Sequence, residues 1–207
     1  MTEWAIRSCY PRPAPVDRGG ETSGAYHQTR PALDPVFTIG HSTHEPEAFG
    51  ELLDRHGVEL LVDVRRYPGS RRVPWTNPGQ LERQLAIPYL HLVGLGGRRE
   101  PAPDSPNGYW NDDAFRGYAD HMASEEFAAA FERLARLAGE RRAAVMCAEG
   151  PWWRCHRRLL SDALVVGGFE VQHIDPGGGA QAHELTDGAV VEGDRLLYPP
   201  AQGRLAL

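Results

Sequence analysis

Short apolar runs alternate with helix-forming segments through most of this sequence, and that alternation constrains the fold more than any other feature. The apolar runs cover residues 36–39, 59–64, 87–93, 143–146 and 169–174. Short apolar runs of this kind are typical of buried strands, whereas apolar residues three and four positions apart are typical of helices. Strands that alternate with helices favour a mostly parallel sheet with helices on both faces. We therefore predict an open, three-layer α/β fold with about five core strands.

The segments between these runs carry signals for the starts and ends of helices. Ser42 and Glu45 have the spacing of a capping box, which predicts a helix that ends at Gly57. Further helices are expected over residues 78–85, 115–139 and 153–166, and a small hairpin over residues 189–198. The second of these helices is expected to break near Ser124. An eight-stranded barrel is excluded, because it typically needs roughly 250 residues.

Residues 1–34 differ in composition from the rest of the chain. They contain several prolines, a pair of glycines and Cys9, and they show no apolar periodicity. This composition predicts a flexible tail or an arm that lies on the domain. We expect its deletion to leave the melting temperature nearly unchanged. Residues 35–207 are predicted to form a single domain.

Charge and composition exclude several classes of function. The formal net charge of −6 argues against a general polyanion-binding domain, since such domains are usually basic. All 22 basic residues are arginine, which excludes a Schiff-base lysine and a P-loop lysine. Any cationic recognition must therefore use guanidinium groups, which bind carboxylate and phosphate oxygens in pairs.

The sequence also favours a particular compartment. Three cysteines in a chain of 207 residues do not make a disulfide framework, and this favours a reducing environment. The N-terminal residues lack a basic region followed by an apolar run, and no stretch approaches the roughly 18 apolar residues of a membrane span. We expect a cytoplasmic protein without a membrane partner.

Polar and ionisable side chains stand near the carboxyl end of every predicted core strand. In open parallel sheets, ligands bind outside these strand ends. We therefore expect a shared site there, although polar residues can also simply mark where a strand meets water. The candidates are His41, Ser42, Asp63, Arg65, Arg66, His91, Cys147, Glu149, Arg154, Cys155, His156 and Arg157.

The densest group of candidates lies in residues 146–158, where a strand, a tight turn and a helix start are predicted. The positive end of the helix would face the crevice, and arginines at 154, 157 and 158 add charge. Such a field lowers the pKa of a thiol, so Cys147 is predicted to be partly thiolate and more reactive than Cys155. The alternative is that both cysteines are buried packing residues.

Known cysteine templates do not fit this segment. A phosphatase loop needs Cys-x5-Arg, but Trp153 occupies the required position and Arg154 comes one residue late. A rhodanese loop fails on spacing in the same way, and the cysteine pattern of nucleobase deaminases is absent. Cys147, Cys155 and His156 could instead supply ligands to zinc or iron.

The second group of candidates follows the second predicted strand. In an extended segment Asp63 and Arg65 share a face, so the carboxylate can orient the guanidinium toward a bound anion. The pair could equally be structural and fix the loop that follows. Trp75 offers a stacking surface nearby, which alone is weak evidence for nucleic acid.

Four separated segments carry a resemblance to a known family. They are Thr38-Ile39-Gly40-His41-Ser42, Asp63-Val64-Arg65-Arg66 with Pro68 and Ser70, Tyr89-Leu90-His91 with Leu95-Gly96-Gly97, and Cys147-Ala148-Glu149 with Cys155-His156-Arg157. In this order they resemble the motifs of the domain of unknown function 488 family, over about residues 36–175. The resemblance implies a fold and a shared site, and it implies no particular reaction.

Three functions remain open. The first is an enzyme acting on an anionic, phosphate-bearing substrate such as a nucleotide or a nucleic-acid end. Its candidate catalytic residues are Cys147, Glu149, His41 and His156, and its candidate substrate-binding residues are Ser42, Asp63, Arg65, Arg66, His91, Arg154 and Arg157. The second is a metal-binding protein that uses Cys147, Cys155 and a histidine. The third is a non-catalytic module that binds nucleic acid or a small ligand through the same arginines.

Overall fold

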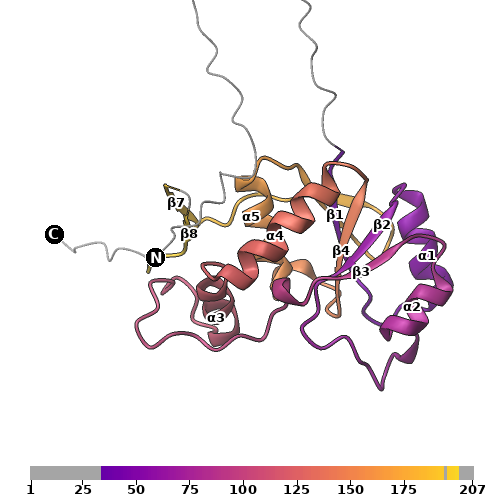
Figure 1. Cartoon of the computed structure of the whole chain (residues 1–207), viewed down its shortest axis with the longest axis horizontal. Coiled ribbons are helices and arrows are strands. Elements are labelled where there is room, and N and C mark those ends of the chain that lie inside the picture. Colours follow the sequence, from indigo (N-terminus) through magenta and orange to yellow (C-terminus); the bar gives the residue numbers. More distant parts are fainter. Residues whose placement is uncertain (1–33, 194, 201–207) are drawn as a thin grey trace, which may run out of the picture.

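The computed structural model describes residues 34–193 and 195–200, which form a six-stranded sheet between two layers of helices (Figure 1). The strands are β1 (Val36–Gly40), β2 (Leu60–Asp63), β3 (Tyr89–His91), β4 (Ala143–Cys147), β5 (Val171–Ile174) and β6 (Ala180–Ala182). Their order in the sheet is β3-β2-β4-β1-β5-β6. The first five are parallel and β6 runs antiparallel to β5. The predicted α/β fold is confirmed.

The helices follow the sequence pattern closely. They are α1 (Pro46–Arg55), α2 (Pro78–Gln84), α3 (Asp113–His121), α4 (Glu125–Ala138) and α5 (Arg157–Val166), with short 3-10 turns η2 (Pro74–Thr76), η3 (Val93–Leu95) and η4 (Trp152–Arg154). The predicted C-terminal hairpin is present as β7 (Val190–Glu192) and β8 (Arg195–Leu197). The predicted break near Ser124 is also confirmed, since the Ser124 side chain accepts a hydrogen bond from the N–H of Phe127 and so caps α4.

Two apolar clusters, one on each face of the sheet, hold the layers together. Helices α1 and α2 cover one face, where Phe49, Leu53 and Leu81 pack against the strands. Helices α3, α4 and α5 cover the other face, where Phe127 and Leu159 are fully buried. Burial of such a side chain stabilises the fold by about 1.5–3 kcal/mol. Helices α1 and α5 therefore leave the neighbouring strands β1 and β4 toward opposite faces.

The chain between β1 and α1 departs from the prediction. Ser42 and Glu45 do not form a capping box, because α1 begins at Pro46 and Glu45 caps it without a side-chain hydrogen bond. Ser42 instead has a positive φ of 46°, and its N–H donates to the carbonyl of Ala148. The serine is therefore tied to the loop after β4, and this tertiary contact overrides the local capping signal.

Three further elements differ from the prediction. The third strand ends at His91, because the chain turns into η3 at Val93. The last helix begins at Arg157, since η4 ends at Arg154 and Cys155 is extended with φ −137° and ψ 154°. Strand β6 was not foreseen, because its Ala-Gln-Ala sequence is exposed and carries no apolar pattern.

Strands β1 and β4 are neighbours in the sheet, and the helices that follow them, α1 and α5, cover opposite faces. Crevices that bind ligands form at such points in open parallel sheets, outside the carboxyl ends of the strands. Pairing continues past these strand ends, where His41 N donates to Cys147 O at 3.0 Å and Ser42 N donates to Ala148 O at 3.0 Å. The backbones are so close that a Cβ on Gly40 would lie 1.8 Å from the carbonyl oxygen of Glu149.

The division into a tail and one domain stays a prediction, since residues 1–33 lie outside the described residues. Within the described part of the chain, no helix is long and apolar enough to cross a membrane.

Candidate functional site

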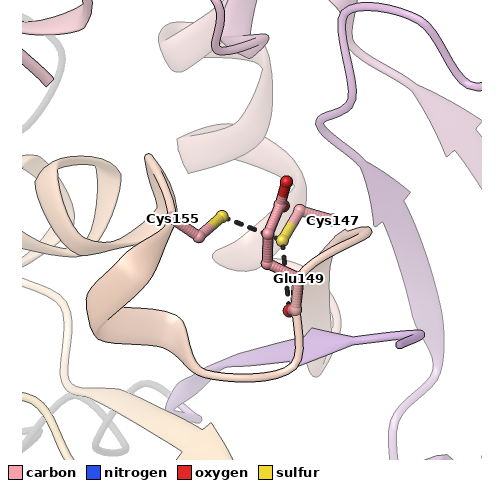
Figure 2. A group of neighbouring side chains, drawn as sticks. All are labelled: Cys147, Glu149 and Cys155. Atoms are coloured by element: carbon pink, nitrogen blue, oxygen red, sulfur yellow. Dashed lines mark hydrogen bonds between the residues drawn. The ribbon is translucent and has the colours of Figure 1, made fainter. Parts of the chain in front are cut away.

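Two cysteines meet at the end of β4. The Sγ atoms of Cys147 and Cys155 lie 2.9 Å apart, and neither is in a disulfide (Figure 2). Cys147 is the last residue of β4 and Cys155 follows η4, so the turn between them brings the two sulfurs together. Both side chains are buried, whereas Glu149 between them in the sequence is exposed.

The groups that stabilise a thiolate gather around Cys155. Its Sγ lies 3.5 Å from His156 Nδ1 and accepts the N–H of Arg157 at 3.5 Å, at the start of α5. Burial alone would raise the pKa of Cys155, but the hydrogen bond from the Cys147 thiol and the charge of His156 hold it well below its usual range. These contacts favour a thiolate at Cys155 over one at Cys147.

The same contacts set the state of the two neighbours. Burial raises the pKa of Cys147 well above its usual value, and the hydrogen bond to Cys155 adds to the effect. Burial alone would lower the pKa of His156, but the adjacent Cys155 thiolate raises it. The expectation of a lowered pKa at Cys147 is thus corrected, because the charges and the helix start face the other sulfur.

Arg157 lies beneath the loop after β4. Its Nη2 donates to the carbonyls of Glu149 at 2.6 Å and Gly150 at 2.9 Å, and its Nη1 donates to Thr38 Oγ1 at 3.4 Å. The side chain is 1% exposed. A guanidinium held in this way supports the loop from inside the protein. It can therefore affect a bound substrate only by fixing the position of the loop.

Asp63 and Arg65 form a buried pair with further partners. Arg65 Nη2 donates to Asp63 Oδ2 at 2.6 Å and to Thr76 O at 2.7 Å, and Arg65 Nη1 donates to Thr76 Oγ1 at 3.3 Å. Tyr89 donates its hydroxyl to Asp63 at 2.8 Å. Because most of the guanidinium's donors are already used inside the protein, this geometry favours the structural alternative for the pair.

The two histidines near Arg65 are held by the backbone. His41 Nδ1 donates to Ser42 O at 3.1 Å, while its Nε2 accepts from Arg65 Nη1 at 3.3 Å. Burial and the Arg65 charge lower the pKa of His41 to about 4, so the ring is neutral near pH 7. His91 Nε2 donates to Arg65 O at 2.7 Å.

A small open pocket of about 60 Å³ lies next to the sulfurs. Its lining residues are Arg65, Arg66, Tyr67, Gly97, Arg98, Ala148, Glu149 and His156. Arg66 Nη1 donates to Arg98 O at 2.6 Å, and its guanidinium lies over the ring of the exposed Tyr67 at 5.5 Å. The pocket therefore combines cationic groups with one aromatic face.

Two glycines allow the loop after β3 to lie close against Arg66 and His156 beside this pocket. A Cβ on Gly96 would lie 2.7 Å from Arg66 Cα, and a Cβ on Gly97 would lie 2.7 Å from His156 Nδ1. Tyr67 and Arg98 also line the pocket but were not among the predicted site residues. The glycine pair before Arg98 was the available signal, since it marks a close approach of backbones.

The predicted site residues thus fall into those that line the pocket and those that do not. Arg65, Arg66, Glu149 and His156 line the pocket, and Cys147, Cys155 and Arg157 do not line it. The remaining positions are different: His41, Asp63 and His91 surround Arg65, Ser42 lies against Gly150, and Arg154 is exposed without lining the pocket. Asp63 pairs with Met146, the residue before Cys147, so the two groups of candidates sit on neighbouring strands.

The donor atoms at the sulfurs could also hold a metal ion. One ligand atom each from Cys147, Glu149 and Cys155 lie within 4.8 Å of one another (Figure 2). His156 Nε2 donates to Val64 O at 3.0 Å, which leaves Nδ1 facing Cys155. Thiolate, imidazole and carboxylate are donors that zinc accepts, and a backbone carbonyl commonly orients a zinc-bound histidine in this way.

Comparison with known families identifies the chain's relatives. Residues 45–164, more than half of the chain, match the family described as domain of unknown function DUF488. The chain belongs to this family. The match runs from α1 into α5 and includes Asp63, Arg65, Cys147, Glu149 and Cys155 of the site. The resemblance predicted from the motifs is confirmed. A comparison with curated proteins finds no match.

Proposed function

We propose that this DUF488 protein is an enzyme that acts on an anionic, phosphate-bearing substrate through the thiolate of Cys155. The observation that carries the proposal is the set of contacts at Cys155 Sγ: His156 Nδ1 at 3.5 Å, the Arg157 N–H at 3.5 Å and Cys147 Sγ at 2.9 Å. A buried charge is costly unless it is paired, so such a set is typical of sites that use the charge.

The adjacent pocket supports an anionic substrate. Arg66 and Arg98 line it, and the Arg98 side chain has no ion pair within the described residues. Guanidinium groups with unused donors bind phosphate oxygens bidentately, and Arg66 uses only Nη1 in its hydrogen bond to Arg98 O. Tyr67 lines the same pocket and is 63% exposed, so the ring face that Arg66 does not cover suits a nucleotide base.

The reaction scheme uses three side chains. The sulfur of Cys155 attacks the electrophilic centre, the bond to the leaving group breaks, and His156 gives its proton to the leaving group. Glu149 lines the pocket and its carboxylate lies within 4.8 Å of both sulfurs. It is therefore placed to take a proton from the water that attacks the group bound to Cys155. The bond from sulfur to that group then breaks, the second product leaves, the thiolate re-forms, and the proton returns to His156.

Alkylation and turnover test the proposal. We expect iodoacetamide to label Cys155 at a lower pH than Cys147, and His156→Gln to move the labelling of Cys155 to higher pH. On a panel of nucleotides and other phosphate esters, Cys155→Ser should abolish turnover and Arg98→Gln should raise KM. Arg71→Gln is the matched control, since Arg71 is exposed and does not line the pocket.

Two outcomes would overturn the proposal. One is labelling of Cys155 only at the pH of an ordinary thiol, with His156→Gln unchanged. The other is turnover that survives Cys155→Ser. Binding of nucleotides or nucleic acid that weakens with salt, with no turnover at all, would support a non-catalytic binding module instead.

A zinc site is the second candidate, because Cys147, Glu149 and Cys155 place donor atoms within 4.8 Å of one another. In this alternative His156 would complete four ligands. Metal analysis of the protein as purified tests it: one zinc per chain, lost in Cys147→Ser, supports a metal centre. Metal-free protein that also fails to bind added zinc contradicts it.

A further inference from the structure

A line of buried polar side chains leads away from the sulfurs toward the C-terminal segment. Thr38 lies in β1, His173 in β5, His183 just after β6, and Asp162 in α5. None of the four is more than 9% exposed. They take no part in the reaction scheme above, and four buried polar groups in one line need a physical account.

The hydrogen bonds along this line run in a single direction. Arg157 Nη1 can only donate, so Thr38 Oγ1 accepts from it at 3.4 Å and passes its own hydrogen to His173 Nδ1 at 2.6 Å. His173 Nε2 then donates to His183 Nδ1 at 2.9 Å, and His183 Nε2 donates to Asp162 Oδ1 at 2.8 Å. This order holds when each ring carries one hydrogen, and it agrees with both ends, because a guanidinium only donates and a carboxylate only accepts.

The far end of the line is anchored firmly. Asp162 also accepts the Thr186 N–H at 2.9 Å and the Tyr198 hydroxyl at 2.7 Å, so its side chain is fixed from three directions. The line therefore joins a buried positive charge to a fixed buried negative charge through two imidazole rings. Burial lowers the pKa of His173 to about 3, so this ring is neutral near pH 7 and can accept the hydrogen of Thr38.

The near end of the line bears on the loop over the sulfurs. Arg157 Nε is buried and has no hydrogen-bond partner among the described residues, so the position of the guanidinium depends on its two Nη groups. Nη1 contacts Thr38, and Nη2 holds the carbonyls of Glu149 and Gly150. Trp152 of the same loop stacks on His173, with ring centroids 4.0 Å apart and planes 7° apart.

We propose that Thr38, His173, His183 and Asp162 are positioning residues that act through Arg157 to fix the loop of residues 148–154 over Cys155. The inference rests on the proposed function in that Cys155 is taken as the reacting group. Thr38, His173 and His183 lie outside residues 45–164, so this support comes from beyond the segment that matches the family.

Thr38→Val and Thr38→Ser form the decisive pair of variants. Valine keeps the shape of threonine and removes the hydroxyl, whereas serine keeps the hydroxyl and removes a methyl group. In the full-length protein at one fixed pH, we expect Thr38→Val to slow alkylation of Cys155 about tenfold, which equals a change of about 1.4 kcal/mol. It should also speed amide hydrogen exchange in residues 148–154, and Thr38→Ser should restore both to near the wild-type values.

Two further variants complete the experiment. His173→Phe keeps a ring under Trp152 but breaks the line, so it should reproduce the effects of Thr38→Val and serves if that variant does not fold. Tyr198→Phe removes only an outer contact of Asp162. It should lower the melting temperature and leave both the alkylation rate and the exchange of residues 148–154 unchanged.

The outcomes separate this inference from the proposed function. Wild-type protein in which Cys155 resists alkylation counts against the proposed nucleophile, and hydrogen exchange then still decides the positioning role. The inference would be overturned if amide hydrogen exchange in residues 148–154 were equally fast in wild type, Thr38→Val and His173→Phe. A Thr38→Ser variant as altered as Thr38→Val would also overturn it, because packing rather than the hydroxyl would then be responsible.

Discussion

At the scale of single residues, the direction of a side chain decides its role more than its type does. The sequence places Arg65 and Arg157 among the anion-binding residues, but the structure turns both guanidiniums inward. Arg65 is held by Asp63 and the Thr76 carbonyl, and Arg157 by the carbonyls of the loop it supports. The pocket arginines that remain for a ligand are Arg66 and Arg98.

Gly40 is the residue on which the closeness of β1 and the loop after β4 depends. Gly40→Ala should destabilise the protein by about 1–3 kcal/mol, because the new Cβ would lie 1.8 Å from the Glu149 carbonyl oxygen and backbone must move. Gly50→Ala is the control. It lies within α1 with open space around it and should stabilise by about 0.5–1 kcal/mol. Urea unfolding measures both, and equal effects would contradict the contact.

At the scale of elements, helix ends show where local signals hold and where they fail. Ser124 and Asp112 cap α4 and α3 as their residue types predict. Ser42 and Glu45 have the spacing of a capping box, yet α1 has no side-chain capping hydrogen bond, although Glu45 is its N-cap residue. The difference is that the backbone of Ser42 is hydrogen-bonded to Ala148, across the strand ends. A cap forms only where no tertiary contact claims the same residue.

A pair of alanine substitutions tests this reading of the caps. Ser124→Ala should cost about 1 kcal/mol, since the N–H of Phe127 loses its hydrogen-bond acceptor. Glu45→Ala should change the free energy of unfolding little, because the Glu45 side chain makes no capping bond. Chemical unfolding of the two variants is the measurement. A loss at Glu45 equal to that at Ser124 would mean that the capping-box prediction was right after all.

At the scale of the whole molecule, two buried histidines are neutral near pH 7. His41 directly follows β1, and His173 lies in the neighbouring strand β5. Burial, with the nearby charge of Arg65, lowers the pKa of His41 to about 4, and burial lowers that of His173 to about 3. In the unfolded chain a histidine pKa is about 6.5. Between these values the unfolded chain binds protons that the folded chain does not, so stability falls as the pH drops from about 6.5 toward 4 and 3.

This linkage predicts acid sensitivity with a defined source. Going from about pH 7 to pH 5, each of the two histidines should cost about 2 kcal/mol of folding stability. In His173→Phe the difference in unfolding free energy between the two pH values should be smaller than in wild type by about that amount. In Gly50→Ala this difference should be the same as in wild type. Urea unfolding at both pH values gives the numbers. A His173→Phe protein with the wild-type pH dependence would show that this ring already carries a proton in the folded state near pH 5.

The sequence by itself determined the order and type of the elements and the residues from which the site is drawn. Apolar periodicity is a local property, so the strands from β1 to β5, the helices and the C-terminal hairpin could be predicted within a few residues. The strand ends carry ionisable groups where the chain leaves the core, so Arg65, Arg66, Glu149 and His156 could be predicted as candidates, and these four line the pocket. Strand β6 could not, because its exposed Ala-Gln-Ala is held only by pairing with β5.

Only the tertiary structure decided how these residues act on one another. It places β4 between β2 and β1. Cys147 at the end of β4 therefore lies opposite Gly40 of β1, and Asp63 of β2 lies opposite the preceding residue, Met146. It gathers the groups that lower a thiol pKa around Cys155, and a pKa depends on which atoms lie within a few ångströms and not on which residues are near in sequence. The line from Arg157 to Asp162 joins four separate segments for the same reason: hydrogen bonds are fixed by distance and direction in space, and the sequence pattern contains neither.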